Sequence, residues 1–366
     1  MTDPTPSSSA SPPLTAIVVV RNDAATLPTA IDSLLTQSYG GDLHIVIAVS
    51  PSTDGTGDLA AALAAEHPRI SVLEFASSSL VVGVNEAIAA ARTSLVIRVD
   101  PRAALPEGFA TEAVAAMART DAVALVARIT PVGTTSFERA VSLATLSSVG
   151  LARDPLTPYG EVSAAAAGPE RQAQSAFAHV IRRRTFIEIG LYNEEIRHGQ
   201  GWELNERLRE AGHTVWFEPA LHLDYRPPSR VVDVTRSLFA EGLWRGEFAR
   251  AFPEEKVLRF FLPSLVVIVT ILAFILGAVG FFGLVAGALG VAAVVSVILF
   301  ALLVVPVVYL VGVVVLAISA MVRTEPRTGL WFALVLPLVH FSWGFGFIAG
   351  FVNLEGAADT VIVDFD

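Results

Sequence analysis

The sequence predicts an α/β domain, in which a parallel-rich sheet is sandwiched by helices, followed by a C-terminal α-helical membrane region. Three observations support this architecture. Apolar, β-branched runs alternate with segments of helical periodicity from Thr15 to about residue 127. Of the 60 charged residues, 53 precede position 260. The 63 residues from Phe260 to Val322 contain no Asp, Glu, Lys or Arg, which leaves room for at least two crossings of about 20 residues each.

The first strand, 16–20, is expected to be buried on both faces, because its run is apolar along its whole length, and 43–49 is expected to be a second buried strand. Helices of the usual periodicity separate these strands, and Leu27, Ile31 and Leu34 begin the first of them. Ligands bind at the carboxyl ends of the strands in such a sheet. The strands are expected at 16–20, 43–49, 70–73, 95–99 and 122–127, and the later helices at about 58–66, 82–91 and 109–119.

The middle of the chain is less easily assigned. Residues 130 to about 178 are rich in Ala, Ser and Gly, and we expect them to be less regular. Order is expected to return at 176–184 and 190–196. A helix is predicted at 202–211, where Gly212 follows as its C′ residue, and a short strand at 215–217.

The C-terminal part begins with an amphipathic, basic segment at 231–252, typical of helices that lie in the membrane interface. One membrane helix is expected at about 262–282 and a second at 285–322, bent near Pro306. Lys256 and Arg259 flank one end and Arg323 and Arg327 the other, so the positive-inside rule predicts two crossings. Residues 330–352 form either a third crossing or a shallow, re-entrant segment.

The expected organisation is a disordered tail (1–13), the α/β domain (14–228), interface helices (229–259), the transmembrane region (260–353) and an acidic tail (354–366). No secretory signal opens the chain, so we expect a multi-pass protein of the cell membrane with its N-terminal domain in the cytoplasm. The net charge of −10 argues against a nucleic-acid partner. The absence of cysteine excludes disulfides, thiol catalysis and Cys-ligated metals.

Asp100 is the first candidate for chemistry, because it ends the predicted strand 95–99. A carboxylate there can ligate a divalent cation through hard oxygen, and the cation would neutralise a bound diphosphate. A turn or cap role is an equally good interpretation, since Asp before Pro favours turns. The run Asp54-Gly55-Thr56 is more simply explained as the end of a strand and the cap of a helix.

A second candidate set surrounds Trp202 and Glu203. A carboxylate near a helix start can act as a general base, and the indole can stack on a sugar ring. The alternative, slightly favoured from the residues alone, is a surface helix in which Glu203 pairs with Arg207 at i,i+4. Trp244-Arg245 is either a phosphate clamp or an interfacial aromatic anchor beside a basic residue. His340 is either functional or satisfied by a backbone carbonyl.

Taken in order, these residues resemble a family 2 glycosyltransferase of the GT-A fold, of the membrane-attached, succinoglycan-biosynthesis type. The resemblance spans about Thr15 to Phe347. It is carried by Ile17-Val18-Val19-Val20-Arg21-Asn22-Asp23, Ser52-Thr53-Asp54-Gly55-Thr56, Gly83-Val84-Asn85, Arg98-Val99-Asp100, Trp202-Glu203-Leu204-Asn205, Tyr225-Arg226-Pro227, Gly242-Leu243-Trp244-Arg245, and His340 with Trp343-Gly344.

The resemblance implies an inverting transfer from a nucleotide-sugar donor to a lipid-linked or polysaccharide acceptor at the membrane. It also implies a divalent cation, Mg²⁺ or Mn²⁺, held by Asp100, and Glu203 as the catalytic residue that replaces the family's base. The donor would be contacted by Arg21, Asn22, Asp23, Ser50, Asn85, Asp100, Trp202, Trp244 and Arg245.

The chain departs from the family pattern at several positions. Val49-Ser50-Pro51 stands where acidic residues are usual, and Arg102 stands where a second carboxylate is expected after Asp100. Gly201 occupies the position of the usual base. Two hypotheses therefore stay open. One is an active inverting transferase, and the other is a catalytically impaired homologue that serves as a structural or regulatory subunit for a membrane-protein partner. A transporter is disfavoured, because the apolar run contains no charged residue.

Overall fold

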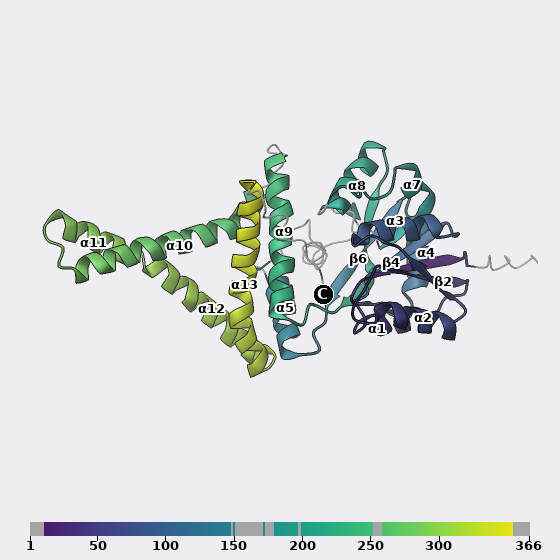
Figure 1. The fold of residues 1–366 in the computed structure, drawn as a ribbon, viewed down its shortest axis with the longest axis horizontal. Coiled ribbons are helices and arrows are strands. Elements are labelled where there is room, and N and C mark those ends of the chain that lie inside the picture. Colours follow the sequence, from purple (N-terminus) through teal and green to yellow (C-terminus); the bar gives the residue numbers. More distant parts are fainter. Residues whose placement is uncertain are drawn as a thin grey trace, which may run out of the picture. The chain divides into compact units, whose positions relative to one another are not determined.

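The structure is a computed structural model that describes residues 11–147, 149–150, 171–172, 179–196, 199–251 and 258–353 (Figure 1). The expected tails, up to residue 10 and from 354 onward, lie outside these residues, as does most of 151–178. The described chain forms two compact units. The first holds the residues up to Pro131 and those from 171 to Arg226, and the second holds 132–150 and the residues from Pro227 onward. The expected domain boundary at 228 is close to this division, but 132–150 belongs to the second unit.

The first unit is built on a mixed, mostly parallel sheet, which confirms the predicted fold class. Its strands, among the described residues, run in the order β3-β2-β1-β4-β8-β6-β9-β5, with β7 paired to β9. β1 pairs in parallel with β2 and β4, and β8 inserts antiparallel between β4 and β6. The strands are β1 (Leu14–Val20), β2 (Leu43–Val49), β3 (Ile70–Glu74), β4 (Leu95–Val99), β5 (Ala103–Ala104), β6 (Ala124–Pro131), β7 (Arg171–Gln172), β8 (Val180–Arg182) and β9 (Val215–Tyr225).

Helices cover both faces of this sheet, so its central strands are mostly apolar. Every residue of β1 is buried. Val18 packs with the helices of one face, and Ile17 packs with those of the other. The first group comprises α1 (Leu27–Leu35), α2 (Thr56–Glu66) and α4 (Phe109–Arg119). The second group comprises α3 (Leu80–Ala90), α7 (Arg183–Glu188) and α8 (Gln200–Glu210). In Figure 1, α1 and α2 lie below the sheet and α3, α7 and α8 lie above it.

Two elements of the fold differ from the sequence prediction. β9 continues to Tyr225 instead of ending near residue 217, because it pairs along its length with β6. Helix α5 (Ser136–Leu146) lies in the stretch that was expected to be irregular. Its start is a capping box, in which the side chain of Thr135 accepts a hydrogen bond from the backbone of Glu138 and the Glu138 carboxylate accepts one in return. The spacing Thr135-x-x-Glu138 is the local signal that could have predicted it.

The second unit is helical. It comprises α5 with α9 (Val231–Ala251), α10 (Leu258–Val285), α11 (Val291–Ala301), α12 (Val304–Arg323) and α13 (Pro326–Phe351). Three described segments are long and apolar enough to span a membrane, namely Ser264–Val285, Val291–Arg323 and Pro326–Phe351. These segments indicate membrane association.

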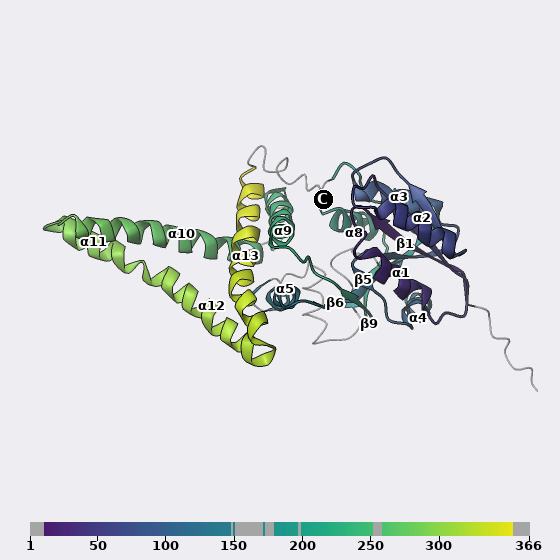
Figure 2. The same cartoon turned by 60° about the horizontal axis from the view of Figure 1, so that its bottom comes forward.

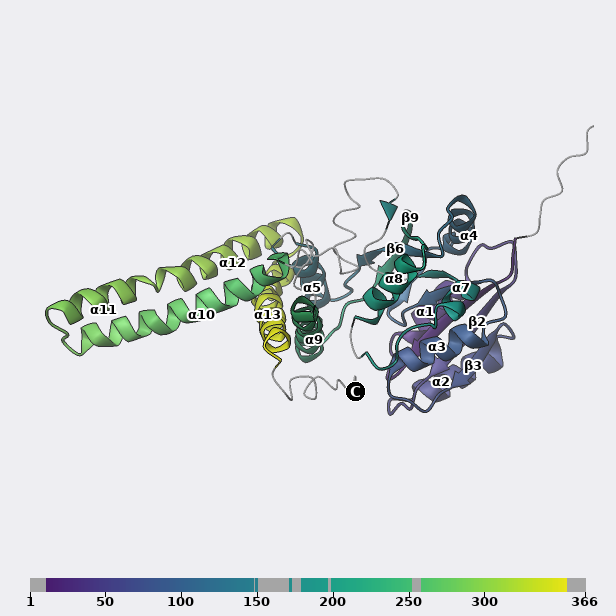
Figure 3. The ribbon, with the colours of Figure 1, turned by 90° about the horizontal axis from the view of Figure 1, so that it is seen from above.

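The second predicted membrane helix, 285–322, begins later than expected, at Val291, and consists of α11 and α12 with an interruption near Pro306, where a bend was predicted. α10 turns back at Gly287 and Gly290, both with positive φ, and α11 and α12 then return beside it as a hairpin (Figure 3). The return arm breaks at Leu302 and Leu303. Pro306 has no N–H to donate to the carbonyl of Leu302, so regular helix cannot continue through this point.

Candidate functional site

The loops that follow β1 and β2 are joined by hydrogen bonds at the carboxyl edge of the sheet. Asn22 has a left-handed backbone (φ 54°), and its side-chain oxygen accepts a hydrogen bond from the backbone of Thr53 at 2.8 Å. The backbone N–H of Asn22 donates to the hydroxyl of Ser52 at 3.2 Å, and that of Asp23 to the hydroxyl of Thr56 at 2.8 Å. Asn22 thus holds the two loops together, which is a structural use of a residue predicted to contact the donor.

Asp54 organises the start of α2, as the simpler interpretation of Asp54-Gly55-Thr56 predicted. Its carboxylate accepts hydrogen bonds from the backbone of Thr56 at 3.0 Å and of Ala24 at 2.9 Å. Burial alone would raise the pKa of Asp54, but these hydrogen bonds, with one from the Thr56 hydroxyl, outweigh it and hold the pKa below its ordinary value. Asp54 is therefore ionised at neutral pH.

Asp23 and Asp100 bring two further carboxylates to the same edge, because they follow the neighbouring parallel strands β1 and β4. Burial raises the pKa of Asp23 to about 6, a backbone hydrogen bond from Arg21 opposes the rise, and the charges of Asp100 and Asp54 add to it. Burial also raises the pKa of Asp100, against the backbone N–H of Arg102 and the charges of Arg102 and Arg98. The edge therefore concentrates negative charge in partly buried positions.

Basic residues flank Asp100. The backbone N–H of Arg102 donates to the Asp100 carboxylate at 2.8 Å, which forms a tight turn at the strand end. The carbonyl of Arg102 accepts a hydrogen bond from the backbone of Arg226 at 2.9 Å, so the segment Tyr225-Arg226 adjoins this turn. β5 pairs with β9 beside it, with Ala103 opposite Tyr225. Sequence analysis treated Arg102 only as a departure from the family pattern, and no local spacing could place Arg226 next to it.

Side-chain oxygen atoms at this edge are the candidate ligands for a divalent cation. Within the described ranges, no three His, Cys, Asp or Glu side chains gather as a metal-binding group. One oxygen of Asp100 accepts the backbone hydrogen bond from Arg102, and carboxylate oxygen is the hard donor that a divalent cation prefers. The residues therefore fit a cation that arrives with a diphosphate and takes most of its ligands from phosphate and water.

Three other predicted donor contacts serve the fold. The hydroxyl of Ser50, only 1% exposed, donates to the carbonyl of Ser77 at 2.9 Å, and Arg21 donates to the carbonyl of Ser78 at 3.4 Å. Both hold the loop that precedes α3. The buried amide of Asn85 donates to the carbonyl of Tyr192 at 2.8 Å and accepts from its N–H at 3.1 Å. Asn85 therefore connects α3 to the chain ahead of α8.

Glu203 lies in the first turn of α8 and forms the predicted ion pair with Arg207. Nε and Nη2 of Arg207 donate to its two carboxylate oxygens at 2.6 and 2.8 Å. Arg207 also donates to the carbonyls of Ile189 and Leu191. Trp202 beside it is partly buried, and Gly201 precedes both in the same first turn. The predicted i,i+4 pair is confirmed, and the role of Glu203 as a base stays a prediction.

Trp244 and Arg245 lie on α9, in the second unit. Arg245 is fully buried, forms an ion pair with Glu241, donates to the Glu241 carbonyl at 2.8 Å, and stacks over the Trp244 ring at 4.3 Å. A buried guanidinium with these partners does not present itself to a diphosphate, so the geometry favours the anchor interpretation over the phosphate clamp. His340 contacts the carbonyl of Val149 at 2.7 Å, which confirms the carbonyl-satisfied interpretation.

The fold and the strand-end carboxylates define a class, the GT-A-type nucleotide-sugar transferase fold. Residues 15–190 match the model of the family described as glycosyl transferase family 2. These residues therefore form a family 2 glycosyltransferase domain, and the enzyme class is glycosyltransferase.

Among known proteins, the succinoglycan biosynthesis protein ExoA of Rhizobium meliloti (strain 1021) is 26% identical over 233 residues, which is 63% of this chain and 68% of that protein. The mannosyltransferase PcManGT from Pyrobaculum calidifontis, in complex with GDP-Man and Mn²⁺, aligns with a TM-score of 0.51 and 15% identity over 94% of this chain and 88% of its own. S. aureus TarS aligns with a TM-score of 0.42 and 14% identity over 63% of this chain, which spans 39% of TarS. The comparisons give the non-catalytic alternative no support.

Proposed function

We propose that this protein is an inverting glycosyltransferase that moves a sugar from a nucleotide-diphosphate donor to a lipid-linked or polysaccharide acceptor at the membrane. The observation that carries the proposal is the strand-end arrangement in a family 2 domain, where Asp100 lies within electrostatic reach of Asp23 and beside Arg102. Parallel α/β sheets bind ligands at this edge. The similarity to a protein named for succinoglycan biosynthesis supports a saccharide acceptor.

The donor would lie across the ends of β1, β2 and β4. Asp100 would hold a divalent cation, Mg²⁺ or Mn²⁺, which when bound would neutralise part of the diphosphate charge. The guanidinium of Arg102 follows directly and would neutralise the rest. A structural relative in complex with GDP-Man and Mn²⁺ supports a nucleotide sugar and a cation of this class. Asp23 would orient polar groups of the nucleotide from the adjacent strand end.

Glu203 would accept the proton of the attacking acceptor hydroxyl. An inverting transfer needs one general base on the face of the sugar opposite the leaving diphosphate. Gly201 has no side chain to serve, and Glu203 lies two residues later on α8. Its carboxylate forms an ion pair with Arg207. Because residues two apart point to different faces of a helix, Glu203 serves only if the acceptor approaches from its side of α8.

The transfer would take place at the inner surface of the cell membrane, with the catalytic domain in the cytoplasm and the apolar helices in the lipid. Arg323 and Arg327, both exposed at the foot of the hairpin, support this orientation through the positive-inside rule. A lipid-linked acceptor would then reach the domain from the plane of the membrane.

The test is a calorimetric titration of the full-length protein in detergent with GDP and UDP, each with and without Mn²⁺, followed by transfer assays with a panel of nucleotide sugars. We expect cation-strengthened binding of at least one nucleotide diphosphate. Gly201→Asp should raise transfer, while Gly201→Asn, which lacks the acid, should not. Absence of nucleotide binding together with absence of transfer by the Gly201→Asp variant would overturn the proposal.

A further inference from the structure

We propose that α13 does not cross the membrane although it has the length and composition of a span, and that it lies along the lipid headgroup surface together with α9 and α5. Only α10 and the α11–α12 arm would then cross, and the end of α13 would stay on the side of the catalytic domain. The inference is independent of the transfer reaction, and it concerns the surface through which the protein meets lipid.

The backbones of α9 and α13 are in direct contact through four glycines. Each helix carries a Gly-x-x-x-Gly pair, and a Cβ atom added to any of these glycines would lie about 2 Å from a backbone carbonyl of the other helix. The contacts advance in step along both helices, so the two run parallel and side by side (Figure 2). The contacts pair Gly242 with Trp343, Gly246 with Phe347, Gly346 with Phe239, and Gly350 with Leu243.

Helix α9 cannot lie in the hydrocarbon core. It follows the last strand of the catalytic unit, and six of its 21 residues are charged. A charged side chain at the centre of a bilayer costs several kcal/mol, and α9 is not among the described helices apolar enough to span. A helix in backbone contact with α9 at Gly346 and Gly350, near its own C-terminal end, must therefore share the location of α9.

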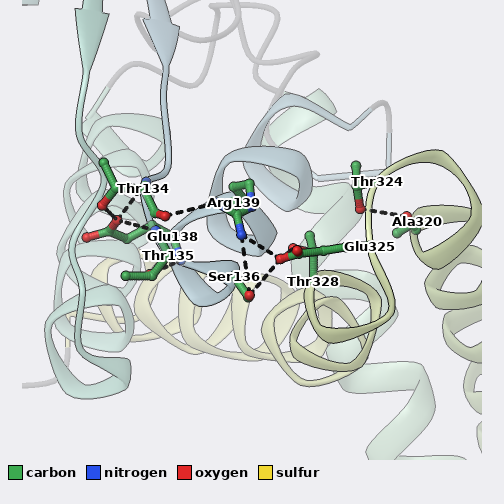
Figure 4. Close-up of polar contacts among 9 residues, drawn as sticks. All are labelled: Thr134, Thr135, Ser136, Glu138, Arg139, Ala320, Thr324, Glu325 and Thr328. Atoms are coloured by element: carbon green, nitrogen blue, oxygen red, sulfur yellow. Dashed lines mark hydrogen bonds and ion pairs between the residues drawn. The ribbon is translucent and has the colours of Figure 1, made fainter.

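Helix α5 holds the other end of α13. α5 follows β6 and precedes β7, so both of its ends lead back to strands of the catalytic sheet. Figure 4 shows how the carboxylate of Glu325, directly before α13, accepts hydrogen bonds from Ser136 at 2.6 Å and from Thr328 at 2.9 Å and pairs with Arg139. These groups hold the pKa of Glu325 down at about 2. A charged cluster of this kind fixes the start of α13 to a helix that does not cross.

The middle of α13 is held in the same way. Nε2 of His340 lies 2.7 Å from the carbonyl of Val149, just beyond the end of α5. A carbonyl only accepts, so Nε2 carries the proton and Nδ1 accepts the hydrogen bond from the Tyr309 hydroxyl of α12 at 3.0 Å. The start of α13 is thus held by α5, its middle by the residue Val149 that follows α5, and its end by α9.

The hairpin formed by α10, α11 and α12 differs from α13 in its direction and in how little of it is covered by protein. α10 leads away from the α9–α13 pair instead of running along it (Figures 1 and 3). In the most apolar window of each segment, 56% of α13 is buried inside the protein, against 28% for Ser264–Val285 and 6% for Val291–Arg323. The two arms of the hairpin need lipid to cover them, whereas α13 is covered mostly by protein.

The remaining face of α13 fits the boundary between headgroups and acyl chains. Leu330, Leu334 and Phe345 are exposed on it, and Phe345 packs on Phe341, which contacts Tyr309 of the hairpin. This face therefore continues the lipid-facing surface of the hairpin. The exposed Arg323 and Arg327 flank its start at the level of the lipid phosphates. The partner of this surface is the membrane lipid itself.

The natural sequence contains no cysteine, so a single introduced cysteine is the only site that a thiol reagent can label. Asp58→Cys marks the catalytic side, Leu289→Cys the far turn of the hairpin, and Asn353→Cys the end of α13. Each variant is placed in sealed vesicles and treated with a membrane-impermeant maleimide. The cysteine at position 353 should be accessible from the same side of the membrane as the cysteine at position 58. Accessibility from the same side as the cysteine at position 289 would overturn the proposal.

Spin labels at Leu334→Cys and Phe345→Cys give a second measurement that does not depend on maleimide access. These positions are 11 residues apart, or about 16 Å along a helix. Paramagnetic relaxers in lipid and water should place both at similar, shallow depths in a surface-lying helix. Depths that differ by about 16 Å would show a crossing helix and overturn the proposal.

Discussion

The carboxylate of Glu203 accepts two hydrogen bonds from the guanidinium of Arg207, one turn further along α8, at 2.6 and 2.8 Å. Arg207 also donates to two backbone carbonyls ahead of the helix, those of Ile189 and Leu191. The arginine would therefore remain anchored if Glu203 turned toward a substrate. This arrangement leaves Glu203 a route to act as a base without loss of the contacts that hold Arg207.

Replacement of this carboxylate should separate its catalytic role from its structural one. Glu203→Gln keeps the shape of the side chain and removes the base, so transfer should fall by about 10² to 10⁴-fold. The matched control is Glu206→Gln on the same helix, which loses only an exposed pair with Arg209 and should retain activity. Equal rates for both variants, measured with the same donor, would show that Glu203 is only a partner of Arg207.

Asn85 should prove to be a structural residue. Its amide makes both a donor and an acceptor hydrogen bond to the backbone of Tyr192 in a buried position, so Asn85→Ala leaves backbone groups unsatisfied. We expect a loss of about 1–3 kcal/mol in the free energy of unfolding, and an unchanged nucleotide Kd. Asn193→Ala, which loses one exposed local contact, is the control and should cost less. Weaker nucleotide binding by Asn85→Ala without a loss of stability would support the predicted contact of Asn85 with the nucleotide-sugar donor.

The glycine contacts of α9 and α13 should be intolerant of side chains. A Cβ at Gly346 would lie 2.1 Å from the carbonyl oxygen of Phe239, whereas one at Gly312 of α12 would meet nothing within 4 Å. Gly346→Leu should therefore lower the melting temperature in detergent markedly, while Gly312→Leu should leave it nearly unchanged. Similar melting temperatures for the two variants would contradict the close packing of these helices.

Local patterns were enough to predict most of the first unit. The strand at 43–49 and the helix at 109–119 have the predicted bounds, because burial on both faces makes a strand apolar throughout and an amphipathic helix shows its period. Residues whose neighbours are distant in sequence were not predictable. The partner of Asn85 lies 107 residues away, and Arg245 is fully buried on α9, a helix that packs against α13 about 100 residues later in the chain. Helix α5 was hidden by its Ala- and Ser-rich surroundings, despite the capping box at Thr135.

Asp100 should control the dependence of nucleotide binding on the cation. Asp100→Asn removes the carboxylate proposed to ligate the cation and keeps an oxygen for the backbone N–H of Arg102. Nucleotide-diphosphate affinity with Mn²⁺ should fall at least tenfold, about 1.4 kcal/mol. Affinity in the presence of a chelator should stay the same as in the natural protein, which provides the control. A cation effect that survives in the variant would assign the cation to other ligands.

Asp23 should make the stability of the protein depend on pH in the direction opposite to that of an ion-paired carboxylate. Burial raises its pKa from the ordinary 3.8 to about 6 in the folded state, so between these values the folded protein binds the extra proton. The free energy of unfolding contributed by Asp23 therefore falls as the pH rises from about 4 to about 6, by at most roughly 3 kcal/mol. The lost stability reflects the cost of keeping a charge buried near Asp100.

The substitution that isolates this effect is Asp23→Asn, which keeps an oxygen to accept the backbone hydrogen bond from Arg21. Near pH 4 both proteins carry a neutral side chain here and should unfold at similar temperatures. At pH 7 the variant should be the more stable, because only the natural protein holds a buried charge at this position. Thermal unfolding of the full-length proteins in detergent between pH 4 and pH 7 measures the difference, in which all other titrating groups cancel. A difference that does not grow with pH would show that Asp23 is already ionised at pH 4, and that burial does not raise its pKa.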